Sequence, residues 1–340
     1  MKNVLVLAIG LVGLLLTNCS PSKPTLYIFN WTYYITNDVI KSFEQKYNVN
    51  VVYDVYSSNE EMFAKLKAGG TGYDIVVPSG DYVSIMISEQ MADSIDKSKI
   101  PNFANLDTSV LSRIGFDPGS SHSVPYMMGS SGIAVNKKHV KDYERSWNIF
   151  ARTDLANKMT LLDDMREVLG AALRSLGYSV NSNNPEELAK ARDVVVQWKK
   201  NILKFDAEAF GKGFAAGEFW VVQGYAENVM KEIDSTMRPD VDFFIPVEGG
   251  GMYMDNFVIL RNSKNKKLAY KFINYIHDPK IYASLVDNLG YPSINTAANP
   301  FRTKKPNYEL SALSSSEFKE DIGTALELYN TMWQEIRVGK

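Results

Sequence analysis

The sequence predicts an α/β protein with two lobes that are joined by crossing strands. Apolar runs typical of buried strands alternate with amphipathic segments typical of helices, which is the order of an open parallel sheet. This alternation occurs in two parts of the chain, and no Pro/Gly-rich linker separates them. A length of 340 residues also fits about two domains.

The first part of the chain supplies three strand–helix pairs. We expect strands at residues 25–29, 49–55 and 73–77, and helices at 37–47, 59–68 and 81–91. The first helix is expected because Val39, Phe43 and Tyr47 share one face at helical spacing. Gly69 ends the second helix, and Pro78 stops the third strand. The pattern favours a parallel sheet with helices on its faces.

The second part continues with a mixture of helices and strands. Residues 123–136 are predicted to be extended chain that is broken at Gly129. A short strand at 218–223 is expected to lead into a helix from Ala226. Further strands are expected at 243–246 and 253–260, and helices at 163–176, 185–200, 267–277, 280–289 and 315–338.

The composition excludes several classes of protein. Hydrophobic residues make up 45% of the chain, so it is not intrinsically disordered. The net charge of −2 lacks the excess of basic residues that is typical of nucleic-acid-binding proteins, and we expect no nucleic-acid partner. One cysteine and three separated histidines exclude zinc-finger spacing and an internal disulfide. No phosphate-binding loop or serine-nucleophile motif occurs, so we expect no cofactor, no bound metal and no enzyme activity.

The N-terminus is typical of an export signal. Lys2 precedes an apolar run, Val4–Leu16, that is shorter than the ~20 residues needed to span a bilayer. The end of this run resembles a bacterial lipobox, which would make Cys19 the lipid-modified first residue of the mature protein. We therefore expect a signal peptide at 1–18 and a lipidated tether at 19–24. The alternative is an uncleaved short membrane anchor.

Aromatic and hydroxyl side chains gather where three predicted strands end. These positions are residues 30–34, 78–82 and 223–225. In open α/β sheets a ligand binds beyond the carboxyl ends of the strands. The sequence therefore places a binding cleft there, with Trp31 as either a core residue or an aromatic platform.

Three carboxylates are candidates for contact with a ligand. Asp164 and Glu167 are three residues apart, so they share a helix face. Taken alone, this spacing is more typical of a helix cap than of a binding site. Asp255 lies in an otherwise apolar strand, where a carboxylate is costly unless it is paired. Its partner would be a structural Arg or Lys, or a cationic ligand.

In these segments the chain resembles the spermidine/putrescine-binding proteins of bacterial polyamine ABC importers, and the resemblance extends from about Leu26 to the C-terminus. The resemblance implies a two-lobed periplasmic binding protein fold (type II-like) that closes over a cleft. It also implies delivery of a polyamine to a membrane permease from a lipid-anchored position in the periplasm. The segments that carry the resemblance are Tyr27–Tyr34, Asn59–Leu66, Tyr73–Ser79, Ile95–Lys99, Leu161–Val168, Met254–Asp255 and Gly290–Pro292.

The resemblance also implies a set of ligand contacts and a division of the chain. The first lobe would comprise residues 25–131 and 254–299, and the second lobe 132–253 and 300–340. Carboxylates would hold the ammonium groups of the ligand, and aromatic faces would cover its methylenes. The implied ligand-binding residues are Trp31, Thr32, Tyr34, Ser79, Asp81, Asp164, Glu167, Tyr253, Asp255 and Tyr291.

The chain departs from the family pattern at several of these positions. Asp81 replaces a common tyrosine, Tyr33 replaces an acid, and Tyr253 replaces a stacking tryptophan. The family's Trp-Asn-Gly pattern appears as residues 222–224, Val-Gln-Gly. Lys319 falls where a ligand-facing glutamine is common. If Lys319 faces the cleft, we expect putrescine to bind at least as tightly as spermidine.

Other readings of the sequence stay open at this point. One alternative is a receptor for another small cationic solute, or for ferric ion bound through Tyr33 and Tyr34. A second alternative is a hydrolase that uses Asp164 and Glu167. A third is a surface protein that binds a host macromolecule. For the polyamine reading, we expect binding to weaken as the pH falls toward ~4, the ordinary pKa of a carboxyl group.

Overall fold

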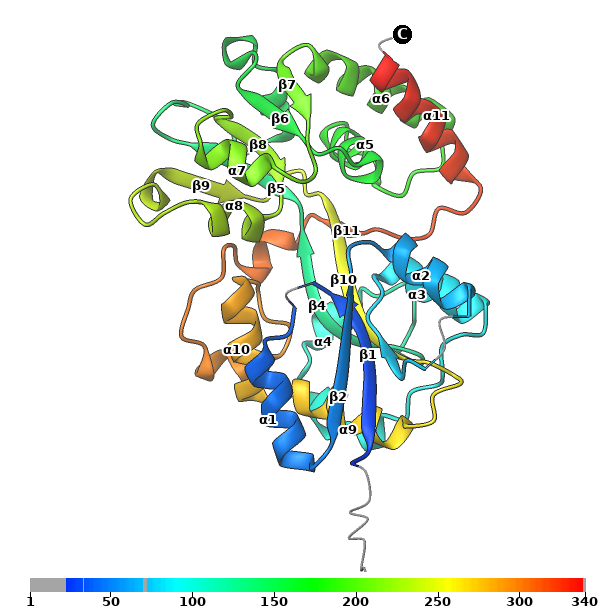
Figure 1. Ribbon diagram of the computed structural model, residues 1–340. Coiled ribbons are helices and arrows are strands. Elements are labelled where there is room, and N and C mark those ends of the chain that lie inside the picture. The colour runs from blue at the N-terminus through cyan, green and yellow to red at the C-terminus, as the bar shows by residue number, and fades with distance from the viewer. Residues whose placement is uncertain (1–22, 33, 70–71, 339–340) are drawn as a thin grey trace, which may run out of the picture.

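The computed structural model describes residues 23–32, 34–69 and 72–338. The chain forms two lobes, each built on one sheet with helices packed against it (Figure 1). The predicted signal peptide 1–18, the lipidation residue Cys19 and Tyr33 lie outside the described residues. Within the described ranges, no helix combines the length and the apolar character that crossing a membrane requires.

The first lobe contains a six-stranded mixed sheet. Strands run in the order β11-β10-β3-β1-β2, and β4 pairs with the other side of β10. The pairs β1–β2, β1–β3 and β10–β11 are parallel, whereas β10 is antiparallel to β3 and β4. The bounds are β1 (Thr25–Trp31), β2 (Asn50–Tyr56), β3 (Ile75–Val76), β4 (Val124–Ser130), β10 (Gly251–Ile259) and β11 (Glu317–Phe318).

Helices cover this sheet and complete the apolar core of the first lobe. Phe43 and Phe272 link two of them, α1 and α9, with ring centroids 5.0 Å apart. Ser58 caps α2 by accepting a hydrogen bond from the Glu61 amide at 3.1 Å. The helices are α1 (Asn37–Tyr47), α2 (Asn59–Lys67), α3 (Gly80–Ser88), α4 (Thr108–Leu111), α9 (Lys266–Ile276) and α10 (Pro279–Leu289).

The second lobe contains a five-stranded sheet in the order β7-β6-β8-β5-β9. Its strands are β5 (Gly132–Asn136), β6 (Met159–Leu161), β7 (Ile202–Phe205), β8 (Val221–Gly224) and β9 (Val241–Phe244). Its helices are α5 (Met165–Ser175), α6 (Pro185–Lys199), α7 (Phe210–Ala215), α8 (Ala226–Glu232) and α11 (Ala325–Val338). The C-terminal helix α11 packs against α5 and α6.

The chain crosses between the lobes in the middle of the molecule. Strand β4 belongs to the first sheet, and β5, which starts two residues after β4 ends, belongs to the second. Strands β9 and β10 make the return crossing, and β11 and α11 make the last one. Figure 1 shows β4 and β10 rising side by side between the lobes. The fold class is the predicted one, while the residue boundaries of the lobes stay a prediction.

Two expectations about elements were wrong, and several short elements were not predicted. The predicted helix 315–338 begins only at Ala325, because Glu317 and Phe318 pair with Gly251 and Met252 as strand β11. The extended segment 123–136 breaks at Ser131 instead of Gly129. Strands β6 and β7 and helices α4 and α7 were not predicted, since they are short. Helix α1 has the predicted bounds, and the other predicted elements differ at their ends by a few residues.

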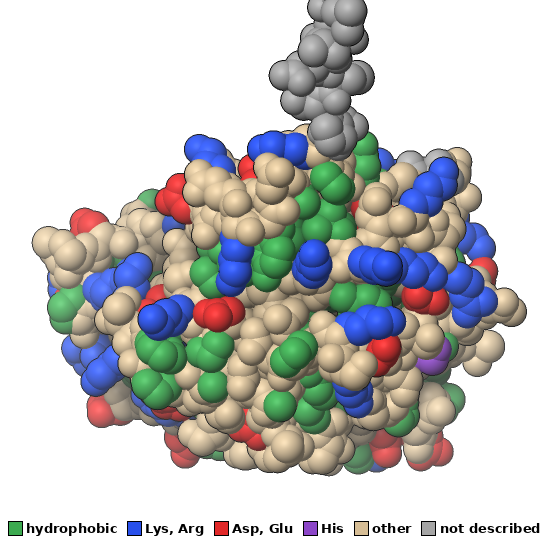
Figure 2. Space-filling model, turned by 90° about the horizontal axis from the view of Figure 1, so that it is seen from below, with side chains coloured by type: hydrophobic (Ala, Val, Ile, Leu, Met, Phe, Trp, Pro, Cys, Tyr) green, Lys and Arg blue, Asp and Glu red, His purple; other side chains and the backbone are tan. Residues whose placement is uncertain are grey.

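The end of the first lobe that faces away from the second lobe has a mixed surface. Figure 2 shows Lys and Arg side chains interspersed there with acidic and apolar side chains. Such interspersion is typical of a solvated protein face. The cavity that charged and aromatic side chains line lies at the opposite end of this lobe, between the two lobes.

Candidate functional site

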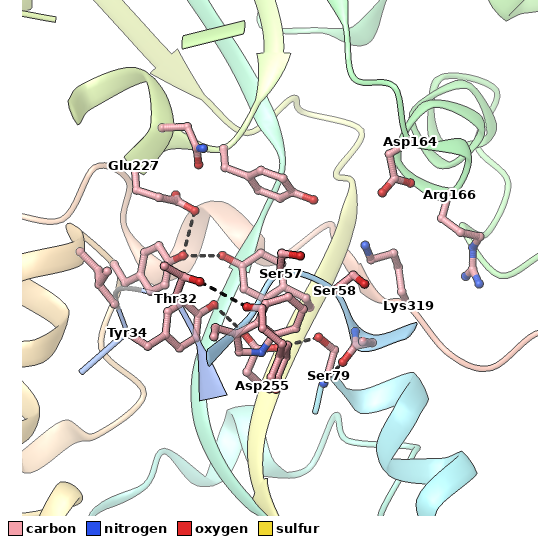
Figure 3. Close-up of a pocket in the computed structure, with 18 of the residues that line it drawn as sticks. Thr32, Tyr34, Ser57, Ser58, Ser79, Asp164, Arg166, Glu227, Asp255 and Lys319 are labelled. Carbon is pink, nitrogen blue, oxygen red and sulfur yellow. Dashed lines mark hydrogen bonds between the residues drawn. The ribbon is translucent and has the colours of Figure 1, made fainter. Parts of the chain in front are cut away.

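A cavity of about 1600 Å³ lies between the lobes, and residues of both lobes line it. The loops after β1, β3 and β8 reach it at the carboxyl ends of their strands, where open α/β sheets bind ligands. Strand β10 crosses beneath it and contributes Tyr253 and Asp255. The two lobes therefore present their side chains to one shared space (Figure 3).

Asp255 is the buried carboxylate at the base of this cavity, and only 1% of it is exposed. The Tyr34 hydroxyl and the Ser79 hydroxyl each donate a hydrogen bond to it at 2.6 Å. Burial raises the pKa of Asp255 to about 6, although these two hydrogen bonds oppose the rise. Among the described residues, no Lys or Arg forms an ion pair with it. Its charge is thus left for a cation that enters the cavity.

A second carboxylate, Glu227, faces the cavity from the first turn of α8. Tyr291 donates a hydrogen bond to it at 2.8 Å, and the Tyr253 hydroxyl donates to Tyr291 at 3.0 Å. Burial raises the pKa of Glu227 to about 7. Glu227 was not among the predicted contact residues, although it follows the predicted strand end at residues 223–225. An acid in the first helical turn after such a strand end was the available signal.

Lys319 brings a positive charge into the same cavity. Its ammonium group forms an ion pair with Glu167, which is 2% exposed and lies behind it on α5. Burial alone would lower the pKa of Lys319, but Glu167, Asp164 and Asp81 together raise it. Burial raises the pKa of Asp81, and Lys319 opposes that rise. The ammonium group of Lys319 is therefore paired with Glu167 and stabilised by the nearby charges of Asp164 and Asp81.

Asp164 combines the two roles that the sequence left open. It is the N-cap of α5, where its carboxylate accepts a hydrogen bond from the Glu167 amide at 3.0 Å. It also lines the cavity. Gln223, from the segment that replaces the family's aromatic pattern, is buried in β8 and donates to the Glu167 carbonyl at 3.1 Å. The segment thus supports the start of α5 and provides no aromatic wall.

Aromatic rings surround the carboxylates. Trp31 packs against Tyr56 in a tilted arrangement, with ring centroids 4.8 Å apart, and donates its indole hydrogen to the Val77 carbonyl at 2.8 Å. Tyr34 and Tyr291 meet edge to face at 6.3 Å. Burial, together with nearby Asp255, raises the pKa of Tyr34 well above its ordinary value, so its hydroxyl stays protonated and donates. These rings give the cavity apolar walls between its charged ends.

Most of the predicted contact residues come together here. Thr32 reaches the same space, and its hydroxyl donates to the Tyr56 carbonyl at 3.4 Å. Of the predicted residues only Glu167 lies behind the cavity wall, where Lys319 covers it. Tyr56, Tyr225, Glu227 and Lys319 line the cavity as well. The predicted residues that line it are Trp31, Thr32, Tyr34, Ser79, Asp81, Asp164, Tyr253, Asp255 and Tyr291.

This arrangement suits a flexible molecule that carries more than one positive charge. Carboxylates at separate points bind ammonium groups, and tyrosine and tryptophan faces cover methylenes and attract cations. In the described part of the chain, no three His, Cys, Asp or Glu side chains are placed to hold a metal ion.

Comparisons with known proteins find relatives over most of the chain. Residues 38–310 match the family model described as bacterial extracellular solute-binding protein. The spermidine/putrescine-binding periplasmic protein of Escherichia coli K12 is 34% identical over 326 residues, covering 93% of this chain and 92% of that protein. The putrescine-binding periplasmic protein SpuD of Pseudomonas aeruginosa is 30% identical, with 93% and 92% covered. The crystal structure of the TpPotD lipoprotein of Treponema pallidum superposes with a TM-score of 0.89 at 48% identity, covering 92% of this chain and 99% of that one.

Proposed function

The chain belongs to the bacterial extracellular solute-binding proteins, and from this premise we propose that it captures a polyamine, putrescine or spermidine, in the cavity between its lobes. Asp255 is the observation that carries the proposal. It is a buried carboxylate that faces the cavity and receives hydrogen bonds from the neutral side chains Tyr34 and Ser79. A buried charge of this kind is stable only with a compensating partner, and a ligand ammonium group supplies one.

The ligand binds through the residues that face this space. Asp255 and Glu227 hold one ammonium group, and Asp81 and Asp164 attract another. Trp31, Tyr34, Tyr253 and Tyr291 cover the methylenes, while Thr32 and Ser79 complete the polar wall. Closing the lobes excludes water and strengthens each of these ion pairs. The names of relatives that bind spermidine and putrescine support this assignment.

The captured polyamine is released to the permease of an ABC importer, without chemical change. The closed lobes are a conformational signal that such a permease reads. A lipid on Cys19 holds the protein at a membrane on its periplasmic side, while the folded body reaches the solute. A structural relative that is itself a lipoprotein supports this anchor.

Calorimetry of the purified full-length chain with putrescine, spermidine, spermine and cadaverine tests the proposal. We expect one-to-one binding of at least one of these amines and a rise in melting temperature on its addition. Mass spectrometry of the ligand after release should find it unchanged. If all four amines give neither heat nor a thermal shift, the chain does not serve as a polyamine receptor.

A further inference from the structure

Lys319 is built into the cavity wall in a way that fixes its ammonium group. The residue directly follows strand β11, and its amide donates to the Met252 carbonyl at 2.9 Å. Its side chain runs over Gly251, where a β-carbon would lie 3.2 Å from the Lys319 Cγ. The absence of a side chain at Gly251 therefore leaves the space that the lysine stem fills. The backbone pairing and this close approach together aim the ammonium group at α5.

The ammonium group of Lys319 forms an ion pair with Glu167, which is buried and has further hydrogen-bond partners inside the protein. Glu167 accepts hydrogen bonds from the Ser131 hydroxyl and from the Tyr225 hydroxyl, the latter at 3.2 Å, in addition to its ion pair with Lys319. The Glu167 side chain is 1% exposed and the Lys319 side chain 19% exposed. A ligand that enters the cavity thus meets the ammonium group of Lys319 before it meets Glu167.

Asp255 and Glu227, two other carboxylates of the cavity, have different partners from Glu167. Asp255 accepts hydrogen bonds from the Tyr34 and Ser79 hydroxyls, and Glu227 accepts one from the Tyr291 hydroxyl. Figure 3 shows Glu227 on one side of the cavity and Asp164 with Lys319 on the other, with tyrosine rings between them. The cavity therefore offers hydroxyl-bonded carboxylates at its base and at one end, whereas the other end already holds the internal cation of Lys319.

We infer that Lys319 is the specificity-determining residue of this cavity, because its ammonium group fills the position at Glu167 that a third ammonium group of a longer polyamine would take. The inference rests on the proposed function. A diamine finds partners in Glu227 at one end of the cavity, in Asp255 at its base, and in Asp81 and Asp164 at the other end. A triamine brings a third charge toward Lys319, where like charges repel and Glu167 is occupied.

A pair of matched ligands tests this on the unaltered full-length chain. Spermidine and N-propylputrescine have the same carbon chain, but the second lacks the third amino group and ends in a methyl group. We expect N-propylputrescine to bind at least tenfold more tightly than spermidine in calorimetry, because its uncharged end can lie beside Lys319. Tighter binding of spermidine than of N-propylputrescine would overturn the inference, whether or not any variant folds.

Variants of the ion pair then test the residue itself. Lys319→Gln should shift the spermidine-to-putrescine affinity ratio at least tenfold toward spermidine, because it frees Glu167 and removes the repulsion. Lys319→Arg keeps the charge, and Lys305→Gln removes an exposed charge elsewhere on the cavity rim, so each should leave the ratio within about threefold. In the double variant Lys319→Gln/Glu167→Gln the preference for spermidine should be lost.

The outcomes separate the inference from the function on which it rests. If a folded Lys319→Gln chain binds putrescine with an unchanged ratio, Lys319 does not determine specificity although the protein binds polyamines. If Lys305→Gln shifts the ratio as much, the effect belongs to the general field of the cavity and the inference fails. If the unaltered chain binds no amine, the proposed function falls, and this inference falls with it.

Discussion

Tyr34 donates its hydroxyl hydrogen to Asp255 at 2.6 Å and so ties the segment after strand β1 to strand β10, 221 residues away in the chain. The bond joins a residue that was predicted from a strand end to one predicted from its apolar surroundings. It leaves the carboxylate oriented by neutral donors and still charged. Preorganised carboxylates of this kind bind a cation without further rearrangement.

Asp255→Asn should weaken polyamine binding by about 2–4 kcal/mol, or roughly 30- to 1000-fold, because the ligand loses a buried charge-assisted bond. Asp38→Asn removes an exposed acid on α1 and is the matched control, for which we expect no change. Titration calorimetry of both variants measures the difference. A loss of less than about threefold for Asp255→Asn would contradict its assigned role.

Glu227→Gln should lower the affinity by about tenfold, which corresponds to ~1.4 kcal/mol. The variant keeps the shape of the side chain and its bond from Tyr291 but removes the charge that faces the ligand. Glu186→Gln changes an exposed acid in the first turn of helix α6, which does not line the cavity, and serves as the control. Equal affinities for the two variants would show that Glu227 does not contact the ligand.

Polyamine binding should weaken as the pH falls from about 8 to about 5.5. The pKa of Asp255 is about 6 and that of Glu227 about 7, so both gain protons across this range and lose the charge that binds an ammonium group. The sequence-based expectation placed this loss near pH 4, because it used ordinary pKa values. Calorimetry in buffers of different ionisation enthalpy should detect protons released on binding at pH 6.5. No proton release there would contradict the raised pKa values.

In the unliganded protein, Asp255 and Glu227 should contribute more to the free energy of unfolding at lower pH, which is opposite to the pH dependence of polyamine binding. Their folded-state pKa values of about 6 and 7 exceed the ordinary values of 3.8 and 4.5, so the folded state binds more protons between these limits. Their contribution to the free energy of unfolding therefore grows as the pH falls through 7 and 6. The double variant Asp255→Asn/Glu227→Gln should lose this contribution, which thermal melts from pH 8 to pH 5 measure against the unaltered chain.

Much of the first lobe was predictable because its signals are local. Helix α1 has the predicted bounds, since its apolar spacing and the residues at its ends are contained in eleven positions. Asp255 was also recognisable, because a lone acid in an apolar strand is costly wherever the chain folds. Both inferences depend on neighbours in sequence.

The parts that escaped prediction depend on distant partners. Residues 317–318 form β11 because Gly251 and Met252 offer a free strand edge, and this tertiary contact overrides a helical pattern. The ion pair of Lys319 with Glu167 joins residues 152 positions apart. Burial likewise raised the pKa of Glu227, and burial is a property of the assembled lobes.

Cys19→Ser should release the protein from the membrane fraction and leave polyamine binding unchanged. Without a thiol no lipid can be attached, and the cavity lies in the folded body far along the chain from this residue. Metabolic labelling with a radioactive fatty acid and cell fractionation measure the anchor, and calorimetry measures the binding. Persistence of the variant in the membrane fraction would instead favour an uncleaved N-terminal anchor.

Gly129→Ala should displace Tyr253 in the cavity wall and so lower both the stability of the protein and its affinity for polyamines. Gly129 pairs directly with Tyr253 across strands β4 and β10, and a β-carbon there would overlap the Tyr253 hydroxyl and crowd Tyr308. The Tyr253 ring must then move, which breaks its hydrogen bond to Tyr291 at 3.0 Å and disturbs the wall beside Glu227. We expect a loss of about 1–3 kcal/mol in the free energy of unfolding, as overpacking in a core costs, together with weaker polyamine binding.

Gly170→Ala is the matched control for this last substitution. Gly170 lies inside α5, and its β-carbon would make an ordinary contact at 3.7 Å with Val180. Alanine also favours a helix over glycine by about 1 kcal/mol, so this variant should be as stable as the unaltered chain or more stable. Chemical denaturation and calorimetry compare the two variants. If Gly129→Ala matches Gly170→Ala in both stability and affinity, the close approach of Tyr253 to Gly129 does not shape the cavity.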